Sequence, residues 1–162
     1  MRILGIDPGL ATVGIGLIEA HSPQKIEPIE WLTIETKPGL TLPERLCELC
    51  NDLKGYLTES APDLAVVEKI YFSKNEKTAL DVAQARGALL STLGTQGIPI
   101  LEPSPSELKA CITGDGRADK QQIQDMLSAM FQLSAPPRPD DAADALALAV
   151  FGALQKHNIV LA

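Results

Sequence analysis

Four acidic residues of this chain are attached to apolar segments: Asp7, Glu68, Asp141 and Asp144. A carboxylate that leaves water without a partner loses its hydration, so an acid in such a place usually has a counter-charge or a metal ion. Carboxylate oxygens are hard ligands that suit Mg²⁺ or Mn²⁺, and no set of His and Cys residues competes for a softer metal. Two such ions, about 3.5–4 Å apart, can activate a water and stabilise the leaving oxygen when a phosphodiester is cut.

Each acid also has an ordinary explanation. Asp7 precedes Pro8-Gly9 and could simply initiate a turn. Acids at the start of a helix complement its dipole, and we accept that explanation for Asp140. It fits Asp144 less well, because a wholly apolar stretch follows it. Four unpaired carboxylates would repel one another strongly without cations, so the set is more informative than any member.

The strands that position these acids follow from short apolar runs between turn residues. Runs at 3–6 and 13–18 on either side of Pro8-Gly9 predict a hairpin whose first strand ends at Asp7. A continuous apolar run at 64–67 predicts a strand covered on both faces that ends at Glu68. Two further strands are predicted, at 26–36 and 98–101.

Apolar residues at helical spacing predict the helices. Two of them start at capping signals, Ser104 and Asp119, and the last one begins at Asp140 and runs to about 156. Asp141 and Asp144 are three residues apart and should project from one face of that helix. The remaining helices are predicted at 42–59 and 79–93. This order of elements predicts an α/β structure with a mixed sheet, one side a hairpin and the other built by helical crossovers.

Composition narrows the class of protein. The 162 residues suit one domain, and no apolar run approaches the roughly 20 residues of a membrane helix. With no signal peptide in the N-terminal pattern, we expect a cytoplasmic protein without a membrane partner. Three cysteines cannot pair completely, and Cys47 and Cys50 are predicted to be buried in a helix. The net charge of −7 argues at first against a nucleic-acid partner, but four of those charges belong to the acid set.

Three segments resemble the RuvC-type Holliday-junction resolvases: GIDPGLATVGIG, VVEKIYFSKNEKTALDVAQARG and DDAADALALA. They stand in the family's order and spacing. The resemblance implies a ribonuclease-H-like fold, with a mixed five-stranded sheet and flanking helices, in a single domain over 1–162. It further implies a homodimer that resolves four-way DNA junctions by paired nicks in recombination and repair, a complex with a branch-migration helicase, and two Mg²⁺ ions per site, which Mn²⁺ can replace.

The resemblance also assigns residues. The family's catalytic and metal-binding acids correspond to Asp7, Glu68, Asp141 and Asp144. Its aromatic junction-contacting position corresponds to Tyr71, and its DNA-contacting lysines to Lys109 and Lys120. Several basic residues lie between Glu68 and Asp125, and as a group we interpret them as phosphate contacts: Lys69, Lys74, Lys77, Arg86, Lys109, Arg117 and Lys120.

Three other functions are compatible with part of the sequence. Actin-like and sugar-kinase ATPases use an Asp-Gly turn to cradle phosphate, but they need a second such domain and give the pair Asp141 and Asp144 no role. A related nuclease acting on structured RNA stays open; the segment YFSKNEK and the complete acid set favour the junction resolvase. A catalytically silent DNA-binding scaffold is disfavoured because all four ligand positions are acidic.

Overall fold

The computed structural model of the protein describes residues 1–70 and 76–160, with the side chains of 76–78 and 156–160 left out. One five-stranded sheet carries the fold, in the order β3-β2-β1-β4-β5. Its strands are β1 (Arg2–Asp7), β2 (Thr12–Ser22), β3 (Lys25–Glu35), β4 (Leu64–Val67) and β5 (Ile100–Leu101). The helices are α1 (Leu42–Ser60), α2 (Glu76–Thr95), α3 (Pro105–Thr113), α4 (Lys120–Phe131) and α5 (Asp140–Val160).

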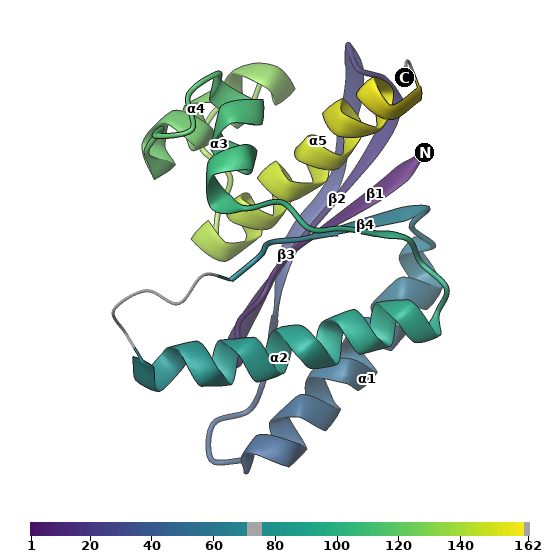
Figure 1. Ribbon diagram of the computed structural model, residues 1–162, viewed down its shortest axis with the longest axis vertical. Coiled ribbons are helices and arrows are strands. Elements are labelled where there is room, and N and C mark those ends of the chain that lie inside the picture. Colours follow the sequence, from purple (N-terminus) through teal and green to yellow (C-terminus); the bar gives the residue numbers. More distant parts are fainter. Residues whose placement is uncertain (71–75, 161–162) are drawn as a thin grey trace.

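The sheet is mixed, as predicted. β1 pairs with β2 and β2 with β3 in antiparallel fashion, whereas β4 is parallel to both β1 and β5. Helices α1 and α2 cover one face, and α5 crosses the other face with α3 and α4 packed beside it (Figure 1). In the described part of the chain, no helix is both long enough and apolar enough to span a membrane.

Alternation along the central strands decides which face each acid reaches. In β1, Leu4 and Ile6 pack toward α1 and α2, while Ile3 packs toward α5. Successive side chains of a strand point to opposite faces, so Asp7 continues the α5 face. In β4, Leu64 and Val66 pack toward α5, and Glu68 follows them with the same parity.

Glycines let α5 lie directly on the sheet backbone. A Cβ at Gly5 would stand 1.9 Å from the carbonyl oxygen of Ala145, and one at Gly14 would stand 1.9 Å from that of Asp141. A Cβ at Gly16 would meet the backbone of Leu146 at 2.5 Å. No larger residue fits at these places, and the close approach brings the start of α5 to the end of β1, where Gly14 pairs with Asp7.

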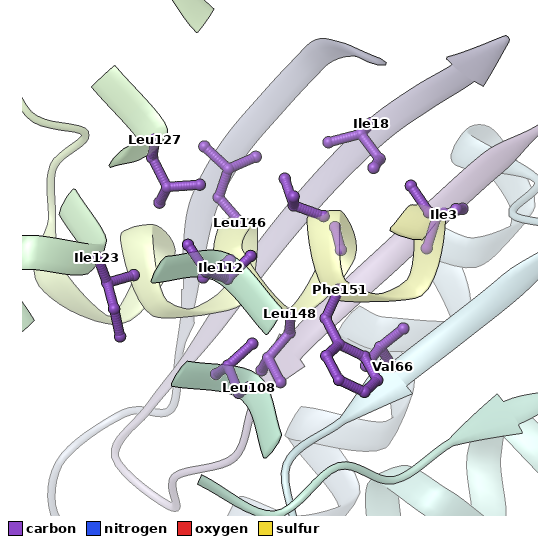
Figure 2. Packing of buried hydrophobic residues seen from close by; sticks show 14 of the residues in the cluster. Ile3, Ile18, Val66, Leu108, Ile112, Ile123, Leu127, Leu146, Leu148 and Phe151 are labelled. Carbon is purple, nitrogen blue, oxygen red and sulfur yellow. The ribbon is translucent and has the colours of Figure 1, made fainter. Parts of the chain in front are cut away.

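The core on the α5 face also fixes α3 and α4. Figure 2 shows Leu146, Leu148 and Phe151 of α5 between sheet residues on one side and helical residues on the other. The sheet contributes Ile3, Ile18 and Val66; α3 contributes Leu108 and Ile112; α4 contributes Ile123 and Leu127. Burying these side chains holds two short helices that would be marginal in isolation, and it places their exposed faces next to the acids.

Both predicted helix starts are confirmed. Ser104 caps α3 and exchanges hydrogen bonds with Glu107, and Asp119 caps α4 and does the same with Gln122. Other boundaries differ from the prediction. α2 already begins at Glu76, and only Ile100 and Leu101 of the run 98–101 pair with the sheet.

The prediction of two buried cysteines in α1 was wrong for Cys47, which is exposed. The buried side of α1 is set by Leu49, Leu53 and Leu57. Cys47 precedes Leu49 by two residues, which is about 200° around a helix, so it faces solvent. Cys50, next to Leu49, is half-buried against the carbonyl oxygen of Ala88.

Candidate active site

Three of the four predicted acids line one cavity of about 200 Å³ at the end of the sheet: Asp7, Glu68 and Asp144. Asp7 is the last residue of β1, and Glu68 directly follows β4. Because Ile6 pairs with Val67 in parallel strands, the next residue on each strand emerges at the same edge. Asp144 comes from the start of α5, which the close packing against Gly5 and Gly14 places beside them.

Asp141 lies one helical turn earlier and lines a neighbouring groove of about 350 Å³. The β1–β2 turn, Arg45 and Asp81 form the other sides of this groove. Two residues three apart differ by about 4.5 Å along a helix axis and about 60° around it. The predicted shared face is therefore only partly realised, although the charge of Asp141 still acts on Asp7.

Burial and mutual repulsion dominate the electrostatics of the acids. Burial raises the pKa of Asp7 to about 7, and the charges of Asp144, Glu68 and Asp141 add to the rise while Lys120 opposes it. Burial and the charge of Asp144 raise the pKa of Glu68, against the influence of Lys109. Burial also raises the pKa of Asp144, although its hydrogen bond with Lys120 works in the other direction. The site thus holds more negative charge than its own lysines neutralise.

The two predicted lysines reach the same cavity from α3 and α4. Lys109 and Lys120 both contribute to its lining, together with the apolar side chains of Leu108 and Ile123. Nζ of Lys120 donates a hydrogen bond to Oδ2 of Asp144 at 2.9 Å and lies 3.4 Å from Oδ2 of Asp140. Burial lowers the pKa of Lys120, but the bond to Asp144 and the two aspartate charges outweigh it and raise the pKa overall.

The residues fit a divalent cation by donor chemistry and by charge. All four acids offer hard carboxylate oxygens. The ammonium group of Lys120, bonded to Asp144, shows that these acids attract a positive charge. Among the described residues, no three acidic, His or Cys side chains converge closely enough to enclose an ion as they stand. Binding of a metal would therefore require the carboxylates to rotate toward one another.

Arg86 was predicted to be a phosphate contact, and the structure places it differently. Its Nε donates a hydrogen bond to the main-chain oxygen of Glu68 at 2.8 Å, and its guanidinium pairs with Glu102. A signal was present in the sequence, because Arg86 lies on the apolar stripe of α2 between Val82 and Leu89.

The remaining predicted contacts are less defined. Tyr71 and Lys74 lie outside the described residues. Lys69 is exposed directly after Glu68, and its N–H donates to the carbonyl oxygen of Pro103. Its charge, after the hydrogen bonds with Ser104, helps to lower the pKa of Glu107.

Known proteins match this chain over most of its length. A model of the family described as crossover junction endodeoxyribonuclease RuvC matches residues 3–152. The crossover junction endodeoxyribonuclease RuvC of Syntrophomonas wolfei is 43% identical over 150 residues, covering 93% of this chain and 87% of that protein. The protein of the same name from Chloroflexus aggregans is 45% identical over 150 residues, covering 93% and 91%.

A solved structure matches as well. T. thermophilus RuvC in complex with Holliday junction substrate superposes with a TM-score of 0.90 and 28% sequence identity. The superposition covers 98% of this chain and 96% of the T. thermophilus chain.

Proposed function

The chain belongs to the RuvC family of crossover junction endodeoxyribonucleases. From that membership we propose that it cuts four-way DNA junctions at a catalytic site formed by four acids: Asp7, Glu68, Asp141 and Asp144. The family resemblance of the three sequence segments and the ribonuclease-H-like α/β fold are both confirmed. The protein is therefore a nuclease that resolves Holliday junctions in recombination and repair.

One observation supports the assignment of the acids most strongly. Asp7, Glu68 and Asp144 are far apart in the sequence and come from two strands and a helix, yet they line one cavity. Asp141 is adjacent on α5 and acts electrostatically on Asp7. Bringing like charges together opposes folding, so a cluster that a protein keeps despite this cost typically marks a functional site.

We assign the acids as ligands of two Mg²⁺ ions, which Mn²⁺ can replace. When bound, these ions activate a water for in-line attack on the phosphorus and stabilise the departing 3′ oxygen. The protein's own part is to fix the carboxylates on rigid elements: β1, the end of β4, and α5 packed on Gly5 and Gly14.

The walls of the cavity suit a phosphodiester strand. Lys109 and Lys120 present positive charge beside the acids, where it attracts the phosphate oxygens of an entering strand. Leu108 and Ile123 form an apolar side that reduces solvent access and strengthens these charge interactions. Lys120, which now contacts Asp144, could exchange that contact for a substrate phosphate if bound cations neutralised the acids.

Recognition of the junction is assigned to the segment after Glu68. By the family correspondence, Tyr71 stacks on a base exposed where the junction arms separate. Lys74, as part of the basic cluster after Glu68, contacts a nearby phosphate. Stacking on an aromatic ring is worth roughly 1–3 kcal/mol per base and tolerates any sequence.

The symmetry of the substrate favours a homodimer. A four-way junction has approximate two-fold symmetry, so a homodimer of this single nuclease domain (1–162) presents one site to each of two opposed strands. Light scattering at micromolar concentration should give the dimer mass, and a monomer that still makes paired cuts would contradict this.

We also assign a cytoplasmic location and a branch-migration helicase as partner, on family membership.

A substrate panel tests the function. The full chain is incubated with labelled four-way junctions, linear duplex and structured RNA, with Mg²⁺ or with EDTA. We expect paired, symmetric nicks in the junction alone, only with Mg²⁺, that leave 5′-phosphates and can be sealed by a ligase. Preferential cutting of the RNA would replace the proposal with the related RNA nuclease, and equal cutting of linear duplex would remove junction specificity.

A further inference from the structure

Arg86 of α2 is fixed at two points. Its Nε donates to the main-chain oxygen of Glu68 at 2.8 Å, and its terminal nitrogen pairs with the carboxylate of Glu102, just after β5. The side chain of Arg86 is only 18% exposed, compared with 40% for Glu102. Charge-assisted hydrogen bonds of this kind are stronger and more directional than neutral ones.

The contact between Arg86 and Glu68 lies just beyond the paired part of β4. β4 ends at Val67, and β5 pairs only with Ala65 and Val66, so Glu68 lies beyond the last β4–β5 pair. On the next residue, the N–H of Lys69 donates to the carbonyl oxygen of Pro103 at 2.8 Å. The bonds from Arg86 and to Pro103 thus hold the main chain on both sides of the peptide that follows Glu68.

Holding that peptide restrains the main chain from which the Glu68 side chain extends. The carboxylate of Glu68 lines the cavity with Asp7 and Asp144, whereas its carbonyl oxygen is taken up by Arg86. Without the Arg86 bond, the main chain at Glu68 would be freer to shift, and the carboxylate carried by the same residue would shift with it. Partners that orient metal ligands in this way typically contribute 10–100-fold to metal affinity or activity.

We propose that Arg86 is a positioning residue, which sets the orientation of Glu68 through its main-chain oxygen while Glu102 anchors the guanidinium. The proposal rests on the proposed function, because it assumes that Glu68 is a metal ligand. It differs from a phosphate-contact role, since a guanidinium already paired with Glu102 and largely buried offers little to the DNA backbone.

The test compares Arg86→Gln, Arg86→Lys and Glu102→Gln with Lys54→Gln, which removes a positive charge at an exposed site on α1. For each full-length variant we would measure Mn²⁺ affinity by calorimetry, junction affinity in EDTA at several salt concentrations, single-turnover cutting at saturating Mg²⁺, and the melting temperature. The calorimetry is independent of cutting.

We expect Arg86→Gln to weaken Mn²⁺ binding and slow cutting by about 10–100-fold, with junction affinity and its salt slope within twofold of the wild type. Arg86→Lys should recover part of both losses, and Glu102→Gln should show a smaller loss of the same pattern. If Arg86→Gln does not fold, Arg86→Lys and Glu102→Gln test the proposal in its place. Lys54→Gln should match the wild type.

Two results would overturn the proposal. Weaker junction binding with a shallower salt slope and unchanged Mn²⁺ affinity would make Arg86 a phosphate contact. A lower melting temperature with unchanged Mn²⁺ affinity and cutting rate would make it purely structural. If the wild type binds Mn²⁺ but cuts no junction, the proposed function fails, while the Mn²⁺ affinities still decide the role of Arg86.

Discussion

Replacing Asp7 with Asn should stabilise the metal-free protein. Asp7 is shielded from solvent among Asp144, Glu68 and Asp141, with Lys120 as the opposing charge, and its pKa rises from 3.8 to about 7. The folded protein holds the Asp7 proton more tightly than the unfolded chain does. The contribution of Asp7 to the stability of the fold is therefore fully present below pH 3.8, and it is lost as the pH rises from 3.8 through 7. Asn cannot ionise, so the variant avoids that loss.

The magnitude follows from the same values. A pKa that moves from 3.8 to about 7 corresponds to about 4 kcal/mol at alkaline pH, using 1.36 kcal/mol per pH unit. This is an upper figure, since the neighbouring carboxylates relax and water shields them. For a protein of this size, each kcal/mol moves the melting temperature by roughly 2–4 °C. We therefore expect Asp7→Asn to melt up to about 16 °C higher at pH 8 in EDTA, with most of the gain gone at pH 4.5.

The assay is thermal unfolding of both proteins between pH 4.5 and 8.5, in EDTA and again in excess Mg²⁺. Mg²⁺ should stabilise the wild type by mass action and reduce or reverse the advantage of the variant. Asp52→Asn, at an exposed acid on α1, is the control and should melt at the wild-type temperature. An Asp7→Asn protein that melts at or below the wild-type temperature at pH 8 in EDTA would refute the argument from repulsion.

Three further predictions test other parts of the site. Gly14→Ala places a Cβ 1.9 Å from the carbonyl oxygen of Asp141. It should lower the free energy of unfolding, measured in urea, by about 1–3 kcal/mol and should slow cutting. Unchanged stability would mean that α5 does not need this contact. Lys109→Gln should make the salt slope of junction binding shallower by about one in gel-shift assays, and an identical slope would place this lysine away from the phosphates. Tyr71→Ala should abolish the change in 2-aminopurine fluorescence that reports junction opening at the crossover, and it should abolish cutting, without lowering the melting temperature. Tyr71→Phe should keep both activities, and early melting or normal cutting by Tyr71→Ala would assign the ring to packing.

The strand ends that carry Asp7 and Glu68 could be predicted because local chemistry encodes them. Short apolar runs stop at those residues, and Pro-Gly or polar residues follow. The caps at Ser104 and Asp119 were equally local, and both form as predicted. By contrast, periodicity does not tell which of Asp141 and Asp144 lines the cavity, because that depends on how α5 lies against the glycines of the sheet.

Arg86 shows a second limit of the sequence. A basic residue near other basic residues suggests a solvent-facing phosphate contact, because each side chain is judged with its chain neighbours. The partners of Arg86 are the main-chain oxygen of Glu68 and the carboxylate of Glu102, brought together only by the parallel pairing of β4 with β5 and by the packing of α2. The apolar stripe of α2 indicates that Arg86 faces inward, but the identity of its partners depends on tertiary structure.

The most direct test of the central claim is a Mn²⁺ titration combined with junction cutting for the wild type and four carboxamide variants: Asp7→Asn, Glu68→Gln, Asp141→Asn and Asp144→Asn. We predict two bound ions per wild-type chain, with each variant folded, lacking at least one ion and unable to cut. If any three of the four variants keep both ions and near-normal cutting, these acids are not the metal site of the nuclease.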